Sequence, residues 1–190
     1  MPAINESTGV SAQVDTKIAF QSSMAGIPDL EALLGHVFAR PDLLEQALTH
    51  TSHARERDAQ KPHATASIDN EQMEFLGDAV LGLVAAEQLC LRFPTFREGE
   101  LSKLRAHLIS EKHLVRVAQE MRLGNYLRLG KGEEKSGGRD KTAILVDALE
   151  AMIAALYLDG GITAARAFIV RKVMDAELER ISNNGSKRVL

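Results

Sequence analysis

Apolar residues recur at helical spacing in two long stretches of the chain, residues 70–89 and 144–159. Side chains three, four and seven positions apart lie on one face of an α-helix, so each stretch predicts a helix with one face toward a core. The predicted buried face of the first helix comprises Met73, Leu76, Val80, Leu83 and Val84. That of the second helix comprises Leu145, Leu149, Met152, Ile153 and Leu156.

Shorter amphipathic segments flank these two helices. They lie at residues 27–36, 41–49, 98–107, 110–124 and 162–181. Pro or Gly marks several of the boundaries, as at Pro94 and at Gly160 and Gly161, which is typical of helix ends. The pattern therefore predicts an all-α fold.

Three polar stretches are predicted to be irregular. Residues 1–26 are weakly patterned and rich in Ser, Ala and Thr, which predicts a disordered leader. Residues 54–69 contain Pro62 and lack apolar periodicity, so we expect an exposed loop there. Residues 183–190 read as a polar tail.

Acidic residues occupy a second face of both long helices. Glu71, Glu74 and Asp78 are spaced i, i+3, i+7 on the first, and Asp147 and Glu150 are spaced i, i+3 on the second. Small residues flank these faces, so the two helices could approach closely with their carboxylates converging. The small residues are Ala79, Gly82, Ala151 and Ala154.

Two glycines interrupt the first helix, Gly77 and Gly82. Each costs roughly 1 kcal/mol relative to Ala inside a helix, which suggests a packing or access requirement. Converging carboxylates would need a cation or protons to offset their repulsion. An all-oxygen set without Cys or His at ligand spacing favours Mg²⁺ or Mn²⁺ over zinc. On spacing alone, two merely solvated acidic faces remain an equal alternative.

The segment NEQMEFLGDAVL resembles the signature of the ribonuclease III family. GELSKLRAHLISEKHL, LRLGKGEEKSGG and ILVDALEAMIAALYLDGG resemble, in order, the segments that follow it in that family. The resemblance covers residues 30–182, and it implies an endonuclease domain at residues 27–182 with the ribonuclease III helical fold. The separate double-stranded-RNA-binding domain that commonly ends such proteins is absent, so either the natural chain is short or its tail is missing from this sequence.

The resemblance implies that Glu74, Asp78, Asp147 and Glu150 are the catalytic, metal-binding carboxylates. It implies hydrolysis of double-stranded RNA to 5′-phosphate and 3′-hydroxyl ends, in processing of ribosomal, messenger or small RNAs. The implied cofactor is Mg²⁺, with Mn²⁺ as a substitute and two ions per active site. One ion would make hydroxide from bound water and the other would stabilise the departing 3′ oxygen.

Cuts on both strands require two active sites, which the family provides through a two-fold homodimer. We expect Phe75, exposed beside the acidic face, to pack into the partner subunit. Glu71 is a second candidate for the interface, with an ordinary solvated acid near a helix N-terminus as the alternative.

Several polar residues are candidates for RNA contact. The resemblance makes His50 and Ser52 part of an RNA-facing turn, although a polar helix end explains them equally well. Zinc binding by His50 with His53 lacks a third ligand. The basic candidates are Lys103, Arg105, His107 and Lys112, which could form a phosphate track, and Lys135 and Arg139. Solvated lysines and arginines would look the same in sequence.

Composition limits the number of domains and the kinds of RNA contact that we expect. The 190 residues are 45% hydrophobic, enough for one sizeable core rather than two full domains. A net charge of −3 is unusual for a partner of a polyanion, although cations at the carboxylates would offset part of it. The absence of Trp and the presence of only two Tyr disfavour an aromatic platform for single-stranded bases.

Cys90 is the only cysteine, so no intrachain disulfide can form, and its apolar neighbours predict a buried thiol. No apolar run reaches the ~18 residues of a membrane span, so we expect a cytoplasmic protein without a membrane partner. The glycine-rich residues 130–140 lack the spacing of a P-loop, which argues against a nucleotide cofactor.

Two rival functions remain for comparison. One is a ribonuclease III-like protein that binds structured RNA without cutting it, which the intact acids disfavour. The other is a di-iron carboxylate bundle, which would need Glu-x-x-His pairs that neither acidic helix contains.

Overall fold

The computed structural model describes residues 26–60 and 68–186, with side chains through residue 183. Within them the secondary structure is helical, apart from a single bridge between Thr49 and Arg128, which agrees with the all-α prediction. The predicted leader falls almost wholly on residues 1–25, which lie outside the described residues. None of the described helices is both long and apolar enough to cross a membrane.

The chain divides into two units, residues 1–37 and 38–190. In the first unit, helix α2 (Ile27–Leu34) begins with Pro28 in its first turn and ends at Gly35, whose φ of 68° suits a residue without a Cβ. The second unit contains α3 (Pro41–Ala47), α4 (Thr51–Gln60), α5 (Glu71–Arg92), α6 (Glu98–Leu108), α7 (Glu111–Glu120), η1 (Leu123–Tyr126), α8 (Lys131–Lys135), η2 (Gly138–Asp140), α9 (Thr142–Phe168), η3 (Ile169–Met174) and α10 (Asp175–Ser186).

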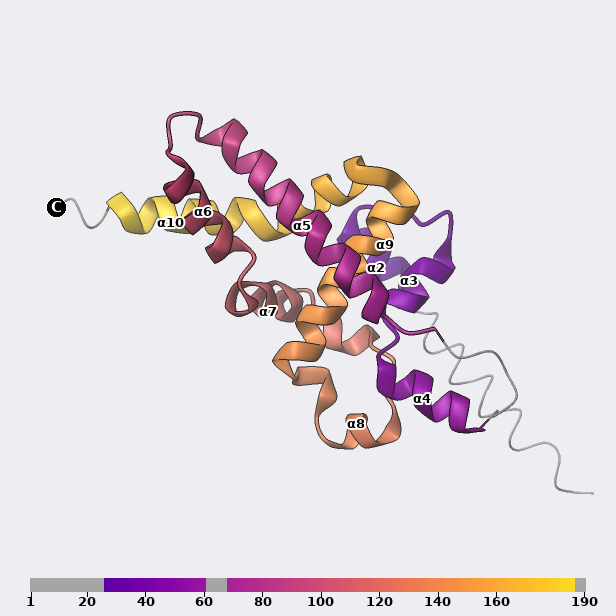
Figure 1. Cartoon of the computed structure of the whole chain (residues 1–190). Helices are drawn as coiled ribbons and strands as arrows, with labels where there is room; N and C mark the ends of the chain where they lie inside the picture. Colours follow the sequence, from indigo (N-terminus) through magenta and orange to yellow (C-terminus); the bar gives the residue numbers. More distant parts are fainter. Residues whose placement is uncertain (1–25, 61–67, 187–190) are drawn as a thin grey trace, which may run out of the picture. The chain divides into compact units, whose positions relative to one another are not determined.

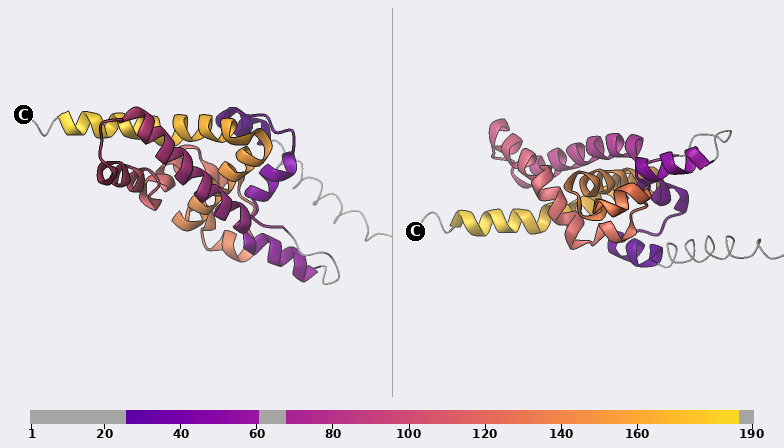
Figure 2. Two further views of the ribbon diagram at one scale, coloured as in Figure 1. Left: turned by 45° about the horizontal axis from the view of Figure 1, so that its top comes forward. Right: turned by 90° about the horizontal axis from the view of Figure 1, so that it is seen from below.

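Helices α5 and α9 pack against each other at the centre of the second unit (Figure 1), and the rotated views show the same pairing (Figure 2). The predicted apolar face of α9 is confirmed, because Leu149, Met152 and Ile153 are fully buried. The same burial extends to Leu145 and Leu156. These two helices therefore form the central pair of the second unit.

The predicted buried face of α5 is confirmed at Met73, Val80 and Val84, but Leu76 is only partly buried and Leu83 is 63% exposed. The buried face runs through Met73, Gly77, Val80, Leu81 and Val84. It is centred on Gly77, where α9 lies close, so Leu83 is turned away from α9. The prediction of a buried thiol is also wrong, because Cys90 is exposed on the same outward-facing side.

Residues 54–69 were expected to form a loop, and this is wrong for the first half, since α4 extends through Gln60. Its sequence ARERDAQ is rich in strong helix formers but presents no apolar face, so periodicity could not reveal it. Residues 61–67 lie outside the described residues.

Two predicted helix ends are shifted or modified. Helix α7 ends at Glu120 rather than near Gly124, and Arg122 adopts a left-handed conformation with φ of 52°. The predicted break at residues 160–161 is confirmed as a kink, because Gly161 has φ of 66° within the continuous span of α9. Asp159 beside it accepts hydrogen bonds from the backbone N–H of Ala39 and Arg40, at 3.1 and 2.8 Å, at the start of α3.

Candidate active site

Gly77 lets α5 and α9 approach closely at one point. A Cβ added to Gly77 would lie 1.8 Å from the backbone oxygen of Glu150 and 2.4 Å from its carbonyl carbon, distances that no side chain can occupy. Gly77 lies between Glu74 and Asp78 in the chain, and Glu150 follows Asp147 by nearly one turn. The contact therefore brings the acid-bearing turns of the two helices together, as the sequence predicted.

The carboxyl of Glu150 is influenced by the other three acids. This side chain is half-buried, and burial together with the charges of Asp78, Glu74 and Asp147 raises the pKa of its carboxyl to about 7. Burial also raises the pKa of Glu74, together with the charges of Asp147, Glu71 and Asp78. The acidic faces are thus coupled across the helix contact rather than separately solvated.

Two further residues influence the pKa of Asp147. Burial raises the pKa of its carboxyl, His50 lowers it, and Glu111 at the start of α7 raises it. The sequence analysis did not identify Glu111 as part of the site. Ser110 marks the start of α7, where its hydroxyl accepts the N–H of His113 at 3.3 Å. Only the tertiary fold brings this helix start near Asp147, so the sequence could not indicate it.

The residues present fit a hard divalent cation. Carboxylates that repel one another in a partly buried setting are stabilised by a cation, and oxygen-only ligands suit Mg²⁺ or Mn²⁺. In the part of the chain that the structure describes, no three Asp, Glu, His or Cys side chains are placed so that they could hold a metal ion together. The acids are therefore close enough to repel without forming a closed coordination shell.

His50 and Ser52 connect the start of α4 to the start of α8. The Ser52 hydroxyl lies 2.8 Å from Nδ1 of His50 and accepts the N–H of Gly130 at 2.9 Å. The backbone N–H of Ser52 also donates to Nδ1 of His50, at 3.2 Å. Because Nδ1 is the acceptor in these contacts, Nε2 of the neutral ring carries the hydrogen.

The basic candidates differ in their surroundings. Lys103, Arg105 and Lys135 are exposed. Arg139, by contrast, donates to Glu134 Oε1 at 2.7 Å and to the backbone oxygens of Gly124 and Leu127 at 2.6 and 2.9 Å. Its guanidinium therefore holds together the turns that precede α9.

The outward side of α5 carries the two residues predicted to meet a partner subunit. Phe75 is 82% exposed, as predicted, and Glu71 is exposed one turn before it. Leu83 on this side is also exposed, at 63%. This side of α5 is unusually apolar for a surface helix.

Comparisons with known proteins converge on one family. A family model described as Ribonuclease-III-like matches residues 40–177. Proteins named Ribonuclease 3 from Solibacter usitatus and Syntrophobacter fumaroxidans are 54% and 47% identical over 147 and 153 residues. These matches cover 77% and 80% of this chain but only 54% and 61% of the relatives, so the chain spans little more than half of their length.

Solved structures give the same result. The nuclease domain of ribonuclease III from Campylobacter jejuni aligns with a TM-score of 0.68 and 41% identity, covering 77% of this chain and 92% of that one. A second structure of that domain, with a TM-score of 0.67 and 41% identity, covers 76% of this chain and 93% of the other. It is described as showing structural flexibility in a region involved in dimer formation.

Proposed function

Since the chain belongs to the ribonuclease-III-like family, we propose that it is a metal-dependent endonuclease that hydrolyses phosphodiester bonds in double-stranded RNA. The observation that carries this proposal is the coupling of the acidic faces of α5 and α9 across the contact at Gly77. The products would be 5′-phosphate and 3′-hydroxyl ends, and the cellular role would be maturation of ribosomal, messenger or small RNAs.

Glu74, Asp78, Asp147 and Glu150 would hold the metal, two Mg²⁺ per site, with Mn²⁺ as a substitute. Bound there, the ions would supply activation of water and stabilisation of the departing 3′ oxygen. The chain's own contribution is to hold the carboxylates at fixed positions on two rigid helices. Their mutual repulsion, which raises the pKa of Glu150 and Glu74, is the feature that a divalent cation would relieve.

His50 is the best-supported of the proposed RNA contacts. Its Nδ1 is occupied by Ser52, which leaves Nε2–H as the donor, and its influence on the pKa of Asp147 supports a position of the ring near the carboxylates. A phosphate oxygen or a 2′-hydroxyl of a bound duplex could accept from Nε2. Ser52 would then orient His50, because its hydroxyl donates to the imidazole Nδ1 and accepts from the Gly130 N–H. Lys103, Arg105 and Lys135 remain candidates for phosphate contact.

We propose a homodimer formed through the outward side of α5. An aromatic side chain as exposed as Phe75 gains stability by burial in a partner, and the neighbouring Leu83 extends the apolar surface. A two-fold dimer would supply the two active sites that a cut of both strands requires. A light-scattering mass close to the 20.7 kDa of one chain, at micromolar concentration, would contradict this part.

The function is tested by incubating the chain with a perfect RNA duplex at low salt, with Mg²⁺ or with a chelator, alongside Glu150→Gln. Metal-dependent cutting with 5′-phosphate products, lost in the variant, is the expected result. Binding without cutting, by a confirmed dimer in Mg²⁺, would overturn the enzyme proposal and favour a silent RNA-binding protein. Cleavage that persists in chelator would overturn the metal site.

A further inference from the structure

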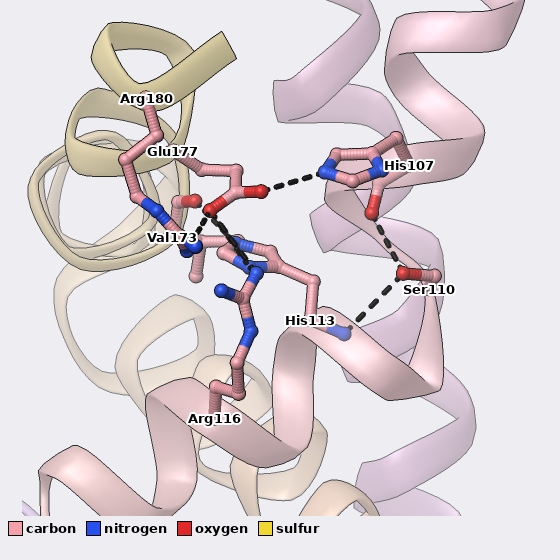
Figure 3. A network of polar contacts seen from close by, with 7 residues as sticks. All are labelled: His107, Ser110, His113, Arg116, Val173, Glu177 and Arg180. Carbon is pink, nitrogen blue, oxygen red and sulfur yellow. Dashed lines mark hydrogen bonds and ion pairs between the residues drawn. The ribbon is translucent and has the colours of Figure 1, made fainter. Parts of the chain in front are cut away.

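A cluster of charged side chains joins the start of α10 to α6 and α7 (Figure 3). Its centre is Glu177, whose side chain is only 7% exposed. Oε1 of Glu177 lies 2.6 Å from His107 Nε2. Oε2 accepts from Arg116 Nη2 at 3.0 Å and from Arg180 Nη1 at 2.8 Å. A buried carboxylate is thus surrounded by donors from three helices.

The same cluster fixes the protonation of His113. Its Nε2 lies 2.7 Å from the backbone oxygen of Val173, and a carbonyl oxygen only accepts, so Nε2 carries the hydrogen. Nδ1 is then an acceptor, and Arg116 Nη2 donates to it at 3.0 Å. Burial lowers the pKa of His113, which agrees with a neutral ring.

Val173 lies in η3, a π-helical turn that separates α9 from α10. Such turns are rare and hold one residue more than the regular helix would. Conversion of η3 to a regular α-helix would rotate every later residue by about 100° around the helix axis. Glu177 would then leave the donors on α6 and α7, so the π turn and the cluster depend on each other.

We propose that His107, His113 and Arg116 form an acid-sensitive latch that holds η3 in its π register through Val173 and Glu177 and thereby fixes the rotational setting of α10. Neutral His113 binds Val173 with one ring nitrogen and Arg116 with the other. Protonation turns Nδ1 from an acceptor into a donor. Arg116 then loses His113 Nδ1 as an acceptor. The charged ring of His113, whose Nδ1 lies 3.8 Å from Glu177 Oε2, competes with Arg116 for the carboxylate.

Acid favours the released state because proton binding by His113 is coupled to release. In the latched state burial holds the pKa of His113 below its ordinary 6.5, whereas in the released state the ring is in water. The released state therefore binds the proton more tightly, and a fall in pH below about 6.5 shifts the equilibrium toward it.

The other charged groups around Glu177 do not produce this response. An ionised carboxylate only accepts, so His107 already donates through Nε2, and added charge on His107 strengthens that bond. Arg116 and Arg180 stay charged throughout. On α10 itself, Asp175 is paired with Arg92 of α5 at 2.7 Å. His113 is therefore the group whose protonation opposes the latch.

Hydrogen exchange measured by mass spectrometry tests the latch in the intact chain. At pH 7.5, Glu177→Gln is expected to speed exchange in peptides of residues 169–183 by about tenfold or more, and to leave residues 144–156 unchanged. The matched control is Glu179→Gln, which removes the same charge from an exposed position of the same helix and should exchange like the wild type. Unchanged exchange in residues 169–183 of Glu177→Gln would overturn the proposal, and so would equal acceleration in both segments.

The acid response is tested at pH 5.5, with exchange corrected for its intrinsic pH dependence. The wild type is expected to lose protection in residues 169–183. His113→Gln should not, because its amide can still donate to Val173 and accept from Arg116 but cannot be protonated. His107→Gln should retain the response. A response that persists in His113→Gln, or disappears only in His107→Gln, would overturn the role of His113.

Discussion

Two glutamates in this protein, one half-buried and one buried, lie in opposite surroundings. Glu150 on α9 faces other carboxylates, and burial together with Asp78, Glu74 and Asp147 raises its pKa to about 7. Glu177 on α10 faces cations. Burial alone would raise its pKa, but the hydrogen bonds from His107 and Arg116 and the positive charge around the carboxylate lower it to about 2.

The contrast distinguishes the proposed metal site from a cluster whose charges are balanced within the chain. The charge of Glu177 is met by side chains of the same chain, so the cluster can fix the position of a helix without any other group. The charge around Glu150 is not met within the described residues, and the helices hold the acids together despite the repulsion. Residues that destabilise one another and are nevertheless held together indicate a functional site.

The largest expected effect comes from removing one carboxylate of the proposed site. Glu150→Gln should lower the rate of duplex RNA cleavage at saturating Mg²⁺ by about 10³-fold or more, since it removes a metal ligand at the reacting phosphate. Stability should not fall, because the substitution also removes repulsion. The measurement is single-turnover cleavage together with urea unfolding.

Glu111→Gln is the informative companion to that variant. Glu111 raises the pKa of Asp147 but lies on α7, outside the four acids, so its loss should change the rate by less than about tenfold. Equal losses in Glu111→Gln and Glu150→Gln would mean that the site is larger than the four carboxylates.

The second prediction uses the two glycines of α5. Gly77→Ala should destabilise the protein by about 3 kcal/mol, because a Cβ at 1.8 Å from a backbone oxygen forces the helices apart. Cleavage should fall as well, since the acids separate. Gly82→Ala meets nothing within 4 Å and should gain about 1 kcal/mol from helix propensity. Urea unfolding of both at one protein concentration checks the difference, and similar changes would show that Gly77 does not set the helix approach.

The sequence alone predicts much of the carboxylate region. Helical spacing located α5 and α9, and the exposure of Phe75 followed from its place between the acidic and apolar faces. Gly77 and Gly82 were indistinguishable, however, because only the position of α9 decides which glycine is in contact. The burial of Leu83 was predicted wrongly for the same reason: the buried face of a helix depends on its partner.

The Glu177 cluster could not be predicted from sequence. Its members lie on three helices, and His107 is 70 positions from Glu177, so no local pattern connects them. In a sequence, polar residues at a helix end are ordinarily interpreted as exposed to solvent. Helix α4 was missed for a different reason: helix propensity without an apolar face leaves no periodic signal.

The third prediction concerns stability and pH. Glu177→Gln should cost about 2–4 kcal/mol at pH 7, because Arg116 and His107 lose the charge they surround. The folded pKa of Glu177, about 2, lies below the ordinary 4.5, so the latched state loses its contribution as pH falls from 4.5 toward 2, and acid release of the latch below about pH 6.5 removes part of it earlier. Urea unfolding from pH 7 to pH 3 should therefore show a loss in the wild type that is smaller in Glu177→Gln. Glu179→Gln should follow the wild type, and a wild-type slope in Glu177→Gln would contradict the prediction.

The smallest expected effect distinguishes the two regions most directly. Mg²⁺ at ten times its dissociation constant should raise the free energy of unfolding by about 1.4 kcal/mol, because it binds the folded carboxylates and not the unfolded chain. Glu150→Gln should lose most of this gain, and Glu177→Gln should keep it, since the charge of Glu177 is already met by His107 and Arg116. The measurement is urea unfolding with Mg²⁺ or with chelator at constant ionic strength. A Mg²⁺ gain that survives in Glu150→Gln but disappears in Glu177→Gln would reverse the assignment of the two regions.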